Sequence, residues 1–463
     1  MKVLFAASEL LPYVKTGGLA DVADALPRAL KKYMDISVVI PLYGFLEIES
    51  LQEFDRFELE LGGILYSIEI YFTLQEGLSV YFIKAPLLST TKHLYGYNDI
   101  DYANNDLRFG IFSAAIVELS LKLKIDLLHL NDWHTALAAL FIDQRSLNIK
   151  TVFTIHNLAY QGIFSKESCE RLGIDPSYFN MDALEFYGQL NSMKGGIAYS
   201  DAVTTVSPSY AQEILTDEFG CGLEGFLSYH DDKLSGILNG INTKVFDPAN
   251  DPYLQECYNS TTLENKHENK VAFLKTSKLK DPRKTLFVVI SRLVEQKGME
   301  LLIKVLPDML EKKINVFVLG EGEELYTSKL NTLASKYSNF DFQNSYDEVL
   351  SHKVYAAADF FVMPSLFEPC GLAQMIAMRY GTIPIVHAIG GLKDSVHEEK
   401  NRCGRGIVFE KYTKKEFSKA IERALKLKRD SEAFKEAVVF NMECDFSFET
   451  GAKSYMKLYE SLF

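Results

Sequence analysis

The sequence contains no long hydrophobic run. Its first nine residues, MKVLFAASE, reach a charge after only five apolar residues, which are too few for the hydrophobic region of a signal peptide. No later apolar run approaches the roughly 20 residues that a membrane-spanning helix needs. We therefore expect a cytoplasmic protein without a membrane partner.

Positive charge is also scarce. The chain has 49 Lys and Arg residues against 62 Asp and Glu, which gives a formal net charge of -13. Nucleic-acid affinity depends largely on Lys and Arg side chains that neutralise phosphates, so this balance argues against a nucleic-acid partner. Any phosphate ligand must instead be bound by a few local cations.

Metal-binding and disulfide patterns are missing as well. The six cysteines include no Cys-x-x-Cys pair, and the nine histidines include no His-Glu-x-x-His. We therefore expect free, reduced thiols. The closest histidine pair, His129 and His134, flanks Asp132, and a metal there is the less favoured interpretation. We expect neither a metal ion nor a cofactor.

The usual patterns of dinucleotide, NTPase and serine-hydrolase sites are not found either. The chain lacks a G-x-G-x-x-G after its first strand, a G-x-x-x-x-G-K-[ST] and a G-x-S-x-G elbow, and it has no clear pair of catalytic carboxylates for hydrolysis. The remaining polar residues favour group transfer from a phosphate-bearing donor.

Short apolar runs do recur, and longer helical patterns separate them. A length of 463 residues with 47% hydrophobic and 24% charged residues indicates a folded protein of two large domains. The alternation predicts an α/β fold with parallel sheets covered by helices on both faces. The expected strands of the first half are KVLFAAS, ISVVIPLY, DLLHLND, TVFTIHN, AVTTVS and LSGILNG, and those of the second half are TLFVVIS, NVFVLG, FDFQNS, DFFVMPS, TIPIVHAIGG and GIVFE.

Two stretches interrupt this alternation. Residues 61–86 alternate with period two around Glu76-Gly77, which predicts a hairpin or meander on the first sheet. Residues 247–270 are polar, rich in turn formers and without apolar periodicity, so we interpret them as the domain boundary.

The segment Lys15-Thr16-Gly17-Gly18 lies between the first strand and a helix that begins near Leu19. Glycine amides and a helix N-terminus form a potential anion site there. The alternative is a tight turn with an exposed lysine, and this segment by itself does not decide between them.

Two second-half segments also follow strands. In ISRLVEQKG, Arg292 and Lys297 could clamp a diphosphate from two sides, or be solvated loop charges. In MPSLFEPCGLAQ, the proline after Glu368 keeps that carboxylate in the loop, and Gly371 and Leu372 open a helix whose amides could bind phosphate. The alternative role of Glu368 is a helix N-terminal cap.

Polar residues end two first-half strands as well. HLNDWHTAL carries Asp132, and TIHNLAYQG carries His156, Asn157 and Gln161. Polar groups and aromatic rings together are typical of a sugar pocket, although a single histidine at a strand end is more often structural. Asn239-Gly240 is interpreted first as a turn.

These segments, together with KTGGLADV, KGGIAYSDAVTTVSPSYAQEI and FEPCGLAQMIAMRYGTIPIV, resemble the bacterial glycogen synthases and the related starch synthases. They occur in the family's order over nearly the whole chain. The resemblance implies a GT-B fold, with two doubly wound Rossmann-like domains facing each other across a deep cleft. It also implies a retaining enzyme that transfers glucose from ADP-glucose to the non-reducing 4-hydroxyl of glycogen or a linear α-1,4-glucan, without a metal ion.

By the same resemblance, three domain segments are expected. Residues 1–243 would form the acceptor-side domain, residues 244–445 the nucleotide-sugar domain, and residues 446–463 a C-terminal helix that crosses back to the first domain. The implied catalytic residues are Glu368, His156, Arg292, Lys297 and Asp132. The implied substrate-binding residues are Lys15, Gly17, Gly18, Asp21, Asn157, Asn239, Tyr346, Cys370, Gly371 and Leu372.

The chain departs from the family's pattern at several positions. Leu366 replaces an arginine and Ala373 a hydroxyl residue near the expected phosphate site. These two changes leave it open whether the preferred donor is ADP-glucose or UDP-glucose. At three further positions the residue differs from the one common in the family. Asn242 replaces an aspartate, and the other two are Leu42 and Phe448. Ile376 stands where broader retaining GT-B families have a second Glu, which favours the glycogen synthase branch. A related transferase with another acceptor and a catalytically silent glucan-binding protein are the alternatives.

Overall fold

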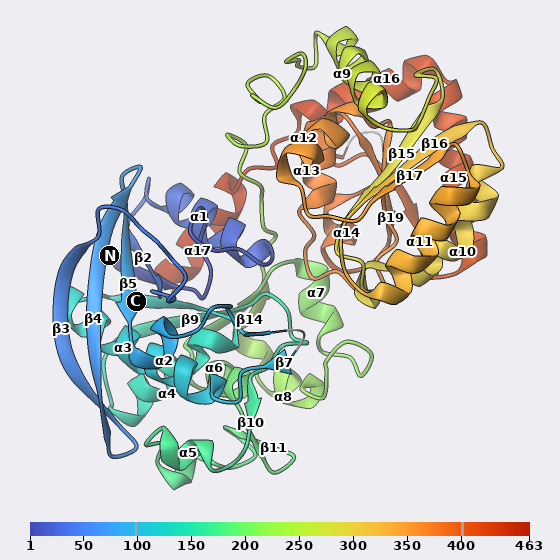
Figure 1. The fold of residues 1–463 in the computed structure, drawn as a ribbon. Helices are drawn as coiled ribbons and strands as arrows, with labels where there is room; N and C mark the ends of the chain where they lie inside the picture. The colour runs from blue at the N-terminus through green and yellow to red at the C-terminus, as the bar shows by residue number, and fades with distance from the viewer. Residues whose placement is uncertain (98–99, 400–401) are drawn as a thin grey trace. The chain divides into compact units, whose positions relative to one another are not determined.

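The computed structural model describes residues 1–97, 100–399 and 402–463. The chain divides into two compact units (Figure 1). Unit 1 comprises Met1–Asn239 together with Phe448–Phe463, and unit 2 comprises Gly240–Ser447. The assignment of the two units to acceptor and nucleotide sugar stays a prediction.

Unit 1 is built on a nine-stranded sheet in the order β14-β13-β9-β8-β1-β2-β5-β4-β3. The seven strands from β14 to β5 are parallel to their neighbours. Buried runs of apolar residues form this part, as parallel strands covered on both faces require. The strands are β1 (Lys2–Ala6), β2 (Asp35–Pro41), β3 (Gln52–Leu61), β4 (Ile64–Gln75), β5 (Leu78–Lys84), β8 (Leu127–Asn131), β9 (Lys150–Ile155), β13 (Ala202–Thr205) and β14 (Leu234–Gly236).

The period-two segment forms the antiparallel edge of this sheet. β4 pairs with β5 through a two-residue turn at Glu76 and Gly77, and both turn residues have positive φ, 47° and 83°. Such a pair of φ values is what a tight hairpin of this handedness needs. The predicted hairpin is confirmed, and β3 extends it into a meander.

The helices of unit 1 include the returning C-terminal helix. α17 packs against α1 in unit 1 (Figure 1), and its buried Tyr459 shares a hydrogen bond with His129 of β8. The helices are α1 (Gly18–Leu30), α2 (Pro86–Ser89), α3 (Asn105–Leu123), α4 (Trp133–Gln144), α5 (Ser168–Arg171), α6 (Ser192–Tyr199), α7 (Pro208–Glu213), α8 (Glu224–Tyr229) and α17 (Glu449–Glu460). Two small sheets add β10 (Ile163–Phe164), β11 (Glu185–Phe186) and β12 (Gln189–Asn191), and β6 (Gly96–Tyr97) and β7 (Ile100–Asp101).

Unit 2 contains a six-stranded, wholly parallel sheet in the order β17-β16-β15-β18-β19-β20. Each strand predicted for the second half is present. The strands are β15 (Thr285–Ile290), β16 (Ile314–Leu319), β17 (Phe340–Gln343), β18 (Phe360–Met363), β19 (Ile383–His387) and β20 (Ile407–Phe409). The helices are α9 (Leu263–Thr276), α10 (Met299–Leu310), α11 (Glu324–Lys336), α12 (Glu348–Ala357), α13 (Ala373–Arg379), α14 (Gly390–Ser395), α15 (Lys414–Arg429) and α16 (Ser431–Glu443).

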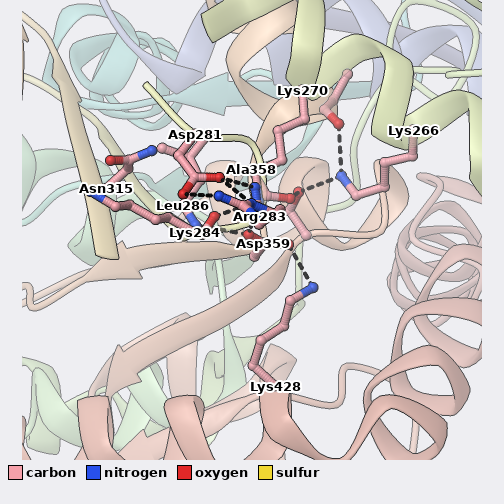
Figure 2. Close-up of polar contacts among 12 residues, drawn as sticks. Lys266, Lys270, Asp281, Arg283, Lys284, Leu286, Asn315, Ala358, Asp359 and Lys428 are labelled. Atoms are coloured by element: carbon pink, nitrogen blue, oxygen red, sulfur yellow. Dashed lines mark hydrogen bonds and ion pairs between the residues drawn. The ribbon is translucent and has the colours of Figure 1, made fainter. Parts of the chain in front are cut away.

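The polar stretch 247–270, interpreted from the sequence as the domain boundary, lies within unit 2, and α9 begins inside it at Leu263. Polar contacts attach this helix to unit 2 (Figure 2). Lys270 forms a buried ion pair with Asp359 at 2.6 Å, and Lys266 donates to the carbonyl of Ala356 at 2.9 Å. The buried residues of α9 are Asn269, Lys270, Phe273 and Leu274. Because half of them are polar, the helix carries little apolar periodicity, which is why the sequence pattern missed it.

The expectation that all cysteines are free is wrong. Cys403 and Cys444 form a disulfide with their Cα atoms 5.7 Å apart, whereas Cys169, Cys221, Cys257 and Cys370 take part in no disulfide within the described residues. The two bonded residues are 41 positions apart, so only the fold brings them together. Sequence motifs for paired cysteines depend on short spacings along the chain, so they do not detect a disulfide between residues this far apart.

Candidate functional site

The predicted site residues of unit 1 follow strands of the parallel sheet. Lys15 lies between β1 and α1, Asp132 directly follows β8, and His156 directly follows β9. Because the carboxyl ends of neighbouring parallel strands meet at one edge of a sheet, these loops lie close together. The His156 amide donates to Asp132 Oδ1 at 2.7 Å, so the structure brings this predicted pair into contact.

Asp132 has an unusual backbone and an unusual environment. It has a φ of 55°, a left-handed value that is uncommon for residues other than glycine. Burial raises the pKa of its carboxyl to about 7, against the opposing effect of hydrogen bonds from the amides of His156 and Asn157. The group therefore titrates near neutral pH, as acids and bases at functional sites often do.

His156 is an uncharged hydrogen-bonding group at neutral pH. Burial lowers the pKa of its imidazole to about 3. Its Nε2 forms a hydrogen bond with Asn131 Oδ1 at 2.8 Å, which orients the ring. A neutral imidazole held in this way can exchange hydrogen bonds with sugar hydroxyls without adding charge.

The Lys15 turn is held by two carboxylates. Lys15 forms an ion pair with Asp21 of α1 at 2.9 Å. Beneath the turn, Glu9 accepts hydrogen bonds from the Thr16 amide at 2.7 Å and from the Gly17 amide at 3.3 Å. Glu9 was not singled out from the sequence, although it is the charged residue that follows the first apolar run and precedes the glycine turn.

In unit 2, Lys297 and Glu368 are in direct contact. Lys297 ends a short 3-10 turn, Glu295–Lys297, after β15, and Glu368 lies in the loop after β18. The Lys297 ammonium donates to both oxygens of the Glu368 carboxylate, at 2.9 and 2.7 Å. Only 5% of Glu368 is exposed, so this carboxylate needs the cation, and Ser365 Oγ donates to it as well at 3.1 Å.

The other predicted site residues of unit 2 include Arg292 and the loop before α13. Arg292 lies close to Gln296, with 3.4 Å between its Nη2 and Gln296 Oε1. Gly371 has a φ of 68°, a conformation that glycine adopts readily. The helix predicted to open at Gly371 and Leu372 begins two residues after Gly371, at Ala373, with Leu372 as its N-cap residue.

The remaining predicted residues are placed as follows. Tyr346 precedes α12 and is 67% exposed. Asn239 is buried, and its amide donates to the Val206 carbonyl at 3.3 Å. Asn157 Oδ1 accepts from the Ala159 amide at 3.1 Å. Lys15, Asp21, Asp132, His156, Asn157 and Asn239 belong to unit 1, and Arg292, Lys297, Tyr346, Glu368 and the Cys370–Leu372 segment to unit 2.

The described part of the chain has neither a cluster of metal-binding side chains nor a membrane-spanning helix. Within residues 1–97, 100–399 and 402–463, no cluster of three or more His, Cys, Asp or Glu side chains could hold a metal ion. No helix in the same part of the chain combines the length and the apolar character that crossing a membrane requires.

Both units of the chain are similar to known proteins. Residues 2–229 match the model of the starch synthase catalytic domain, and residues 271–438 match that of the glycosyl transferases group 1. A glycogen synthase of Aquifex aeolicus is 43% identical over 467 residues, which cover 100% of this chain and 99% of that protein. A glycogen synthase of Bacillus cereus is 38% identical over 480 residues, with complete coverage of both.

Solved structures agree in fold. The catalytic domain of starch synthase IV from Arabidopsis thaliana, bound to ADP and acarbose, has a TM-score of 0.91 and 35% identity, with 99% of each chain covered. The sucrose-phosphate synthase of Thermosynechococcus elongatus has a TM-score of 0.65 at 17% identity over 100% of this chain and 99% of that one, and supports the fold alone. The expected fold class, α/β of the GT-B type with two Rossmann-like domains, is confirmed.

Proposed function

The chain belongs to the family of bacterial glycogen synthases and starch synthases, and on this premise we propose that it is a retaining glucosyltransferase that elongates an α-1,4-glucan. It transfers glucose from ADP-glucose to the 4-hydroxyl at the non-reducing end and releases ADP. The donor and the acceptor, glycogen or a linear α-1,4-glucan, are its two partners in this reaction.

Full-length similarity carries the proposal. The match to a glycogen synthase at 43% identity extends over all of this chain and 99% of the relative, so it runs through both units. The relative with 35% identity holds ADP, which is what ADP-glucose leaves behind after transfer.

The cations of unit 2 are proposed to bind the donor diphosphate. Arg292 offers a planar fork of donors and Lys297 a compact charge. Lys297 is paired with Glu368, so a phosphate oxygen that approaches the ammonium competes with that carboxylate. Glu368 is thereby released toward the transferred glucose, where we assign it the essential role, and Lys297 stabilises the charge that develops on the leaving ADP.

The other roles follow the resemblance. Lys15 binds the donor, Gly17 and Gly18 admit the diphosphate close to the backbone, and Tyr346 stacks on the adenine. Asp132 and His156 line the glucose pocket, with Asp21 nearby, and Asn157 and Asn239 are further substrate-binding residues. Cys370, Gly371 and Leu372 form the wall of the distal phosphate site.

The test is glucose incorporation into glycogen by the purified protein, with ADP-glucose and UDP-glucose in parallel and no added metal. We expect incorporation from ADP-glucose, α-1,4-linked by NMR of the product, and loss of incorporation in the matched variant Lys297→Met. Incorporation mainly from UDP-glucose would overturn the donor assignment, and Leu366 and Ala373 would then be the residues to exchange.

A lack of incorporation from both donors would contradict glycogen synthesis. Two measurements then separate the alternatives. Transfer to another saccharide in an acceptor panel would indicate a related transferase. Binding of ADP or glucan without any transfer would indicate a catalytically silent binding protein.

A further inference from the structure

The amides of the Lys15 turn already have an anionic partner, the buried side chain of Glu9. Only 3% of Glu9 is exposed, although the turn above it lies at the surface. Its Oε2 accepts from the amides of Thr16 and Gly17, at 2.7 and 3.3 Å. Its Oε1 accepts from Thr16 Oγ1 at 2.6 Å. Successive backbone amides that converge on one anion form a nest, and here the chain supplies the anion itself.

A second arm of this network leads to Tyr95. The Tyr95 hydroxyl donates to Glu9 Oε1 at 2.7 Å, and it also shares a hydrogen bond of 2.8 Å with Ser8 Oγ. The Tyr95 ring stacks on His134 with the ring centroids 4.5 Å apart. Since His134 is two residues after Asp132, one carboxylate connects the turn that carries Lys15 to the loop that carries Asp132.

The hydrogen bonds of Glu9 exhaust its acceptor capacity. Each carboxylate oxygen accepts two hydrogen bonds from protein groups, and a buried carboxylate requires such satisfaction. Glu9 therefore acts on its neighbours and not on a ligand. The same carboxylate is close enough to Asp132 that its charge contributes to the raised pKa of that residue.

We propose that Glu9 is a positioning residue for the donor, one that holds the Lys15 turn and Tyr95 in a single arrangement beside Asp132. This inference rests on the proposed function. Because the Thr16 and Gly17 amides are engaged by Glu9, the turn recognises the nucleoside diphosphate through the Lys15 ammonium. The diphosphate can still pass close to the backbone of Gly17 and Gly18, but it makes no hydrogen bond to the Thr16 and Gly17 amides, which Glu9 already occupies.

The test compares Glu9→Gln with wild type and with the control variant Glu69→Gln. Glu69 also accepts a hydrogen bond from a tyrosine, Tyr71 at 2.5 Å, but it lies on β4. In Glu9→Gln an NH2 group replaces one acceptor oxygen. The amides of Thr16 and Gly17 and the hydroxyls of Thr16 and Tyr95 therefore cannot all keep their acceptors. The readouts are the KM for ADP-glucose, the KM for glucan, kcat and thermal unfolding.

We expect Glu9→Gln to raise the KM for ADP-glucose at least about tenfold, as the loss of one or two charge-assisted hydrogen bonds predicts. The KM for glucan should stay near that of wild type, and Glu69→Gln should change neither KM. The unfolding temperature of Glu9→Gln should fall by a few degrees, because one or two buried donors lose their acceptor. The variants Thr16→Val and Glu9→Gln should be non-additive in a double-mutant cycle, because both act through the same turn. An unchanged donor KM, or equal losses for donor and acceptor, would overturn the proposal.

Two further measurements keep this test independent of the proposed function. Wild-type incorporation of glucose decides the function, whereas the ratio of variant to wild type decides the role of Glu9. If wild type transfers no glucose, calorimetric binding of ADP and amide hydrogen exchange of residues 10–20 decide the role instead. Weaker ADP binding with faster exchange at Thr16 and Gly17 in Glu9→Gln would support it, and unchanged ADP affinity would refute it.

Discussion

The ion pair of Lys297 and Glu368 is more buried than that of Lys15 and Asp21. Their side chains are 18% and 6% exposed, against 29% and 14% for Lys15 and Asp21. Removing one partner of such a pair leaves a buried charge without compensation, which costs more than the pair itself contributes. Effects of these residues on activity and on stability must therefore be measured separately.

Glu368→Gln separates the two effects, because Gln can still accept hydrogen bonds from Lys297 and Ser365. We expect glucosyl transfer to fall by a factor on the order of 100, a typical loss when an electrostatic contribution to a transition state is removed. Steady-state kinetics give the loss, and thermal unfolding checks that the variant is folded. Glu300→Gln, at an exposed ion pair with Lys304, is the control. A Glu368→Gln rate within a few-fold of wild type would contradict the assigned role.

Alanine substitutions at Gly17 and Gly371 are expected to have opposite effects on stability. Among the described residues, a Cβ atom built on Gly17 would meet no heavy atom within 4 Å, and its φ is -152°. Gly17→Ala should therefore unfold at the wild-type temperature yet raise the KM for ADP-glucose about tenfold if the diphosphate approaches the backbone there, a loss of about 1.4 kcal/mol. A wild-type KM would remove Gly17 from the donor site.

Gly371→Ala should instead lower stability. Its φ of 68° is strained for alanine, and the added Cβ would lie 2.6 Å from Gln374 Oε1. Left-handed backbone at a residue other than glycine costs roughly 1–3 kcal/mol. Calorimetric unfolding of unit 2 measures the effect, and an unfolding temperature equal to that of wild type would show that the loop can rearrange.

At the scale of elements, α9 shows how a helix can be attached by polar groups. Asp359, the residue before β18, accepts from Lys270 of α9 and pairs with Lys428 of α15 at 2.7 Å (Figure 2). Asp359 Oδ2 also accepts from the Leu286 amide of β15 at 2.8 Å. One buried carboxylate thus joins two helices to the central strands, and such a network is stable only while all its members are present.

Lys266 makes the attachment of α9 depend on pH. Burial lowers the pKa of Lys266 to about 7, whereas an unfolded lysine titrates near 10.4. Between these values the unfolded chain binds one more proton than the folded chain, so the unfolding free energy rises with pH by up to about 1.4 kcal/mol per unit. Below pH 7 the protonated Lys266 makes no further change.

The variant Lys266→Met should lose this pH dependence. Hydrogen exchange of α9 peptides at pH 7 and pH 9, corrected for intrinsic rates, measures the opening free energy. We expect protection in wild type to increase between the two pH values and protection in Lys266→Met to stay nearly constant. Equal slopes for the two proteins would show that Lys266 is charged in the folded state.

At the scale of the whole molecule, the chain passes between the units twice. The first passage is at Asn239–Gly240 and the second at Ser447–Phe448. Within unit 2 the two passages run side by side, because the Ile241 amide donates to the Phe446 carbonyl at 2.8 Å. Unit 1 is therefore completed only by the last residues of the chain.

A chain shortened to residues 1–447 should have a defective unit 1 and an intact unit 2. It loses Tyr455 and Tyr459, both fully buried, and leaves His129 of β8 without the hydrogen bond to the Tyr459 hydroxyl. Each buried polar group that loses its partner costs roughly 1–3 kcal/mol, besides the lost apolar burial. Limited proteolysis should cleave unit 1 first, and equal resistance of the two units would contradict this order.

The sequence by itself determined the local patterns and the family. Buried apolar runs predicted the parallel strands, period-two alternation predicted the β4–β5 hairpin, and the residues at the strand ends predicted candidates such as Asp132, His156, Lys297 and Glu368. These features are legible because strand burial, turn chemistry and helix starts depend on neighbours a few residues away.

Only the tertiary structure decided which distant residues meet. The attachment of α9 by lysines, the Cys403–Cys444 disulfide, the pairing of Lys297 with Glu368 and the position of Glu9 beneath the Lys15 turn all join side chains from separate elements. No periodicity encodes such contacts, since they depend on strand order and loop paths in the folded chain. The sequence therefore predicted the groups to which the proposed chemistry is assigned, and the fold determined which partners those groups contact.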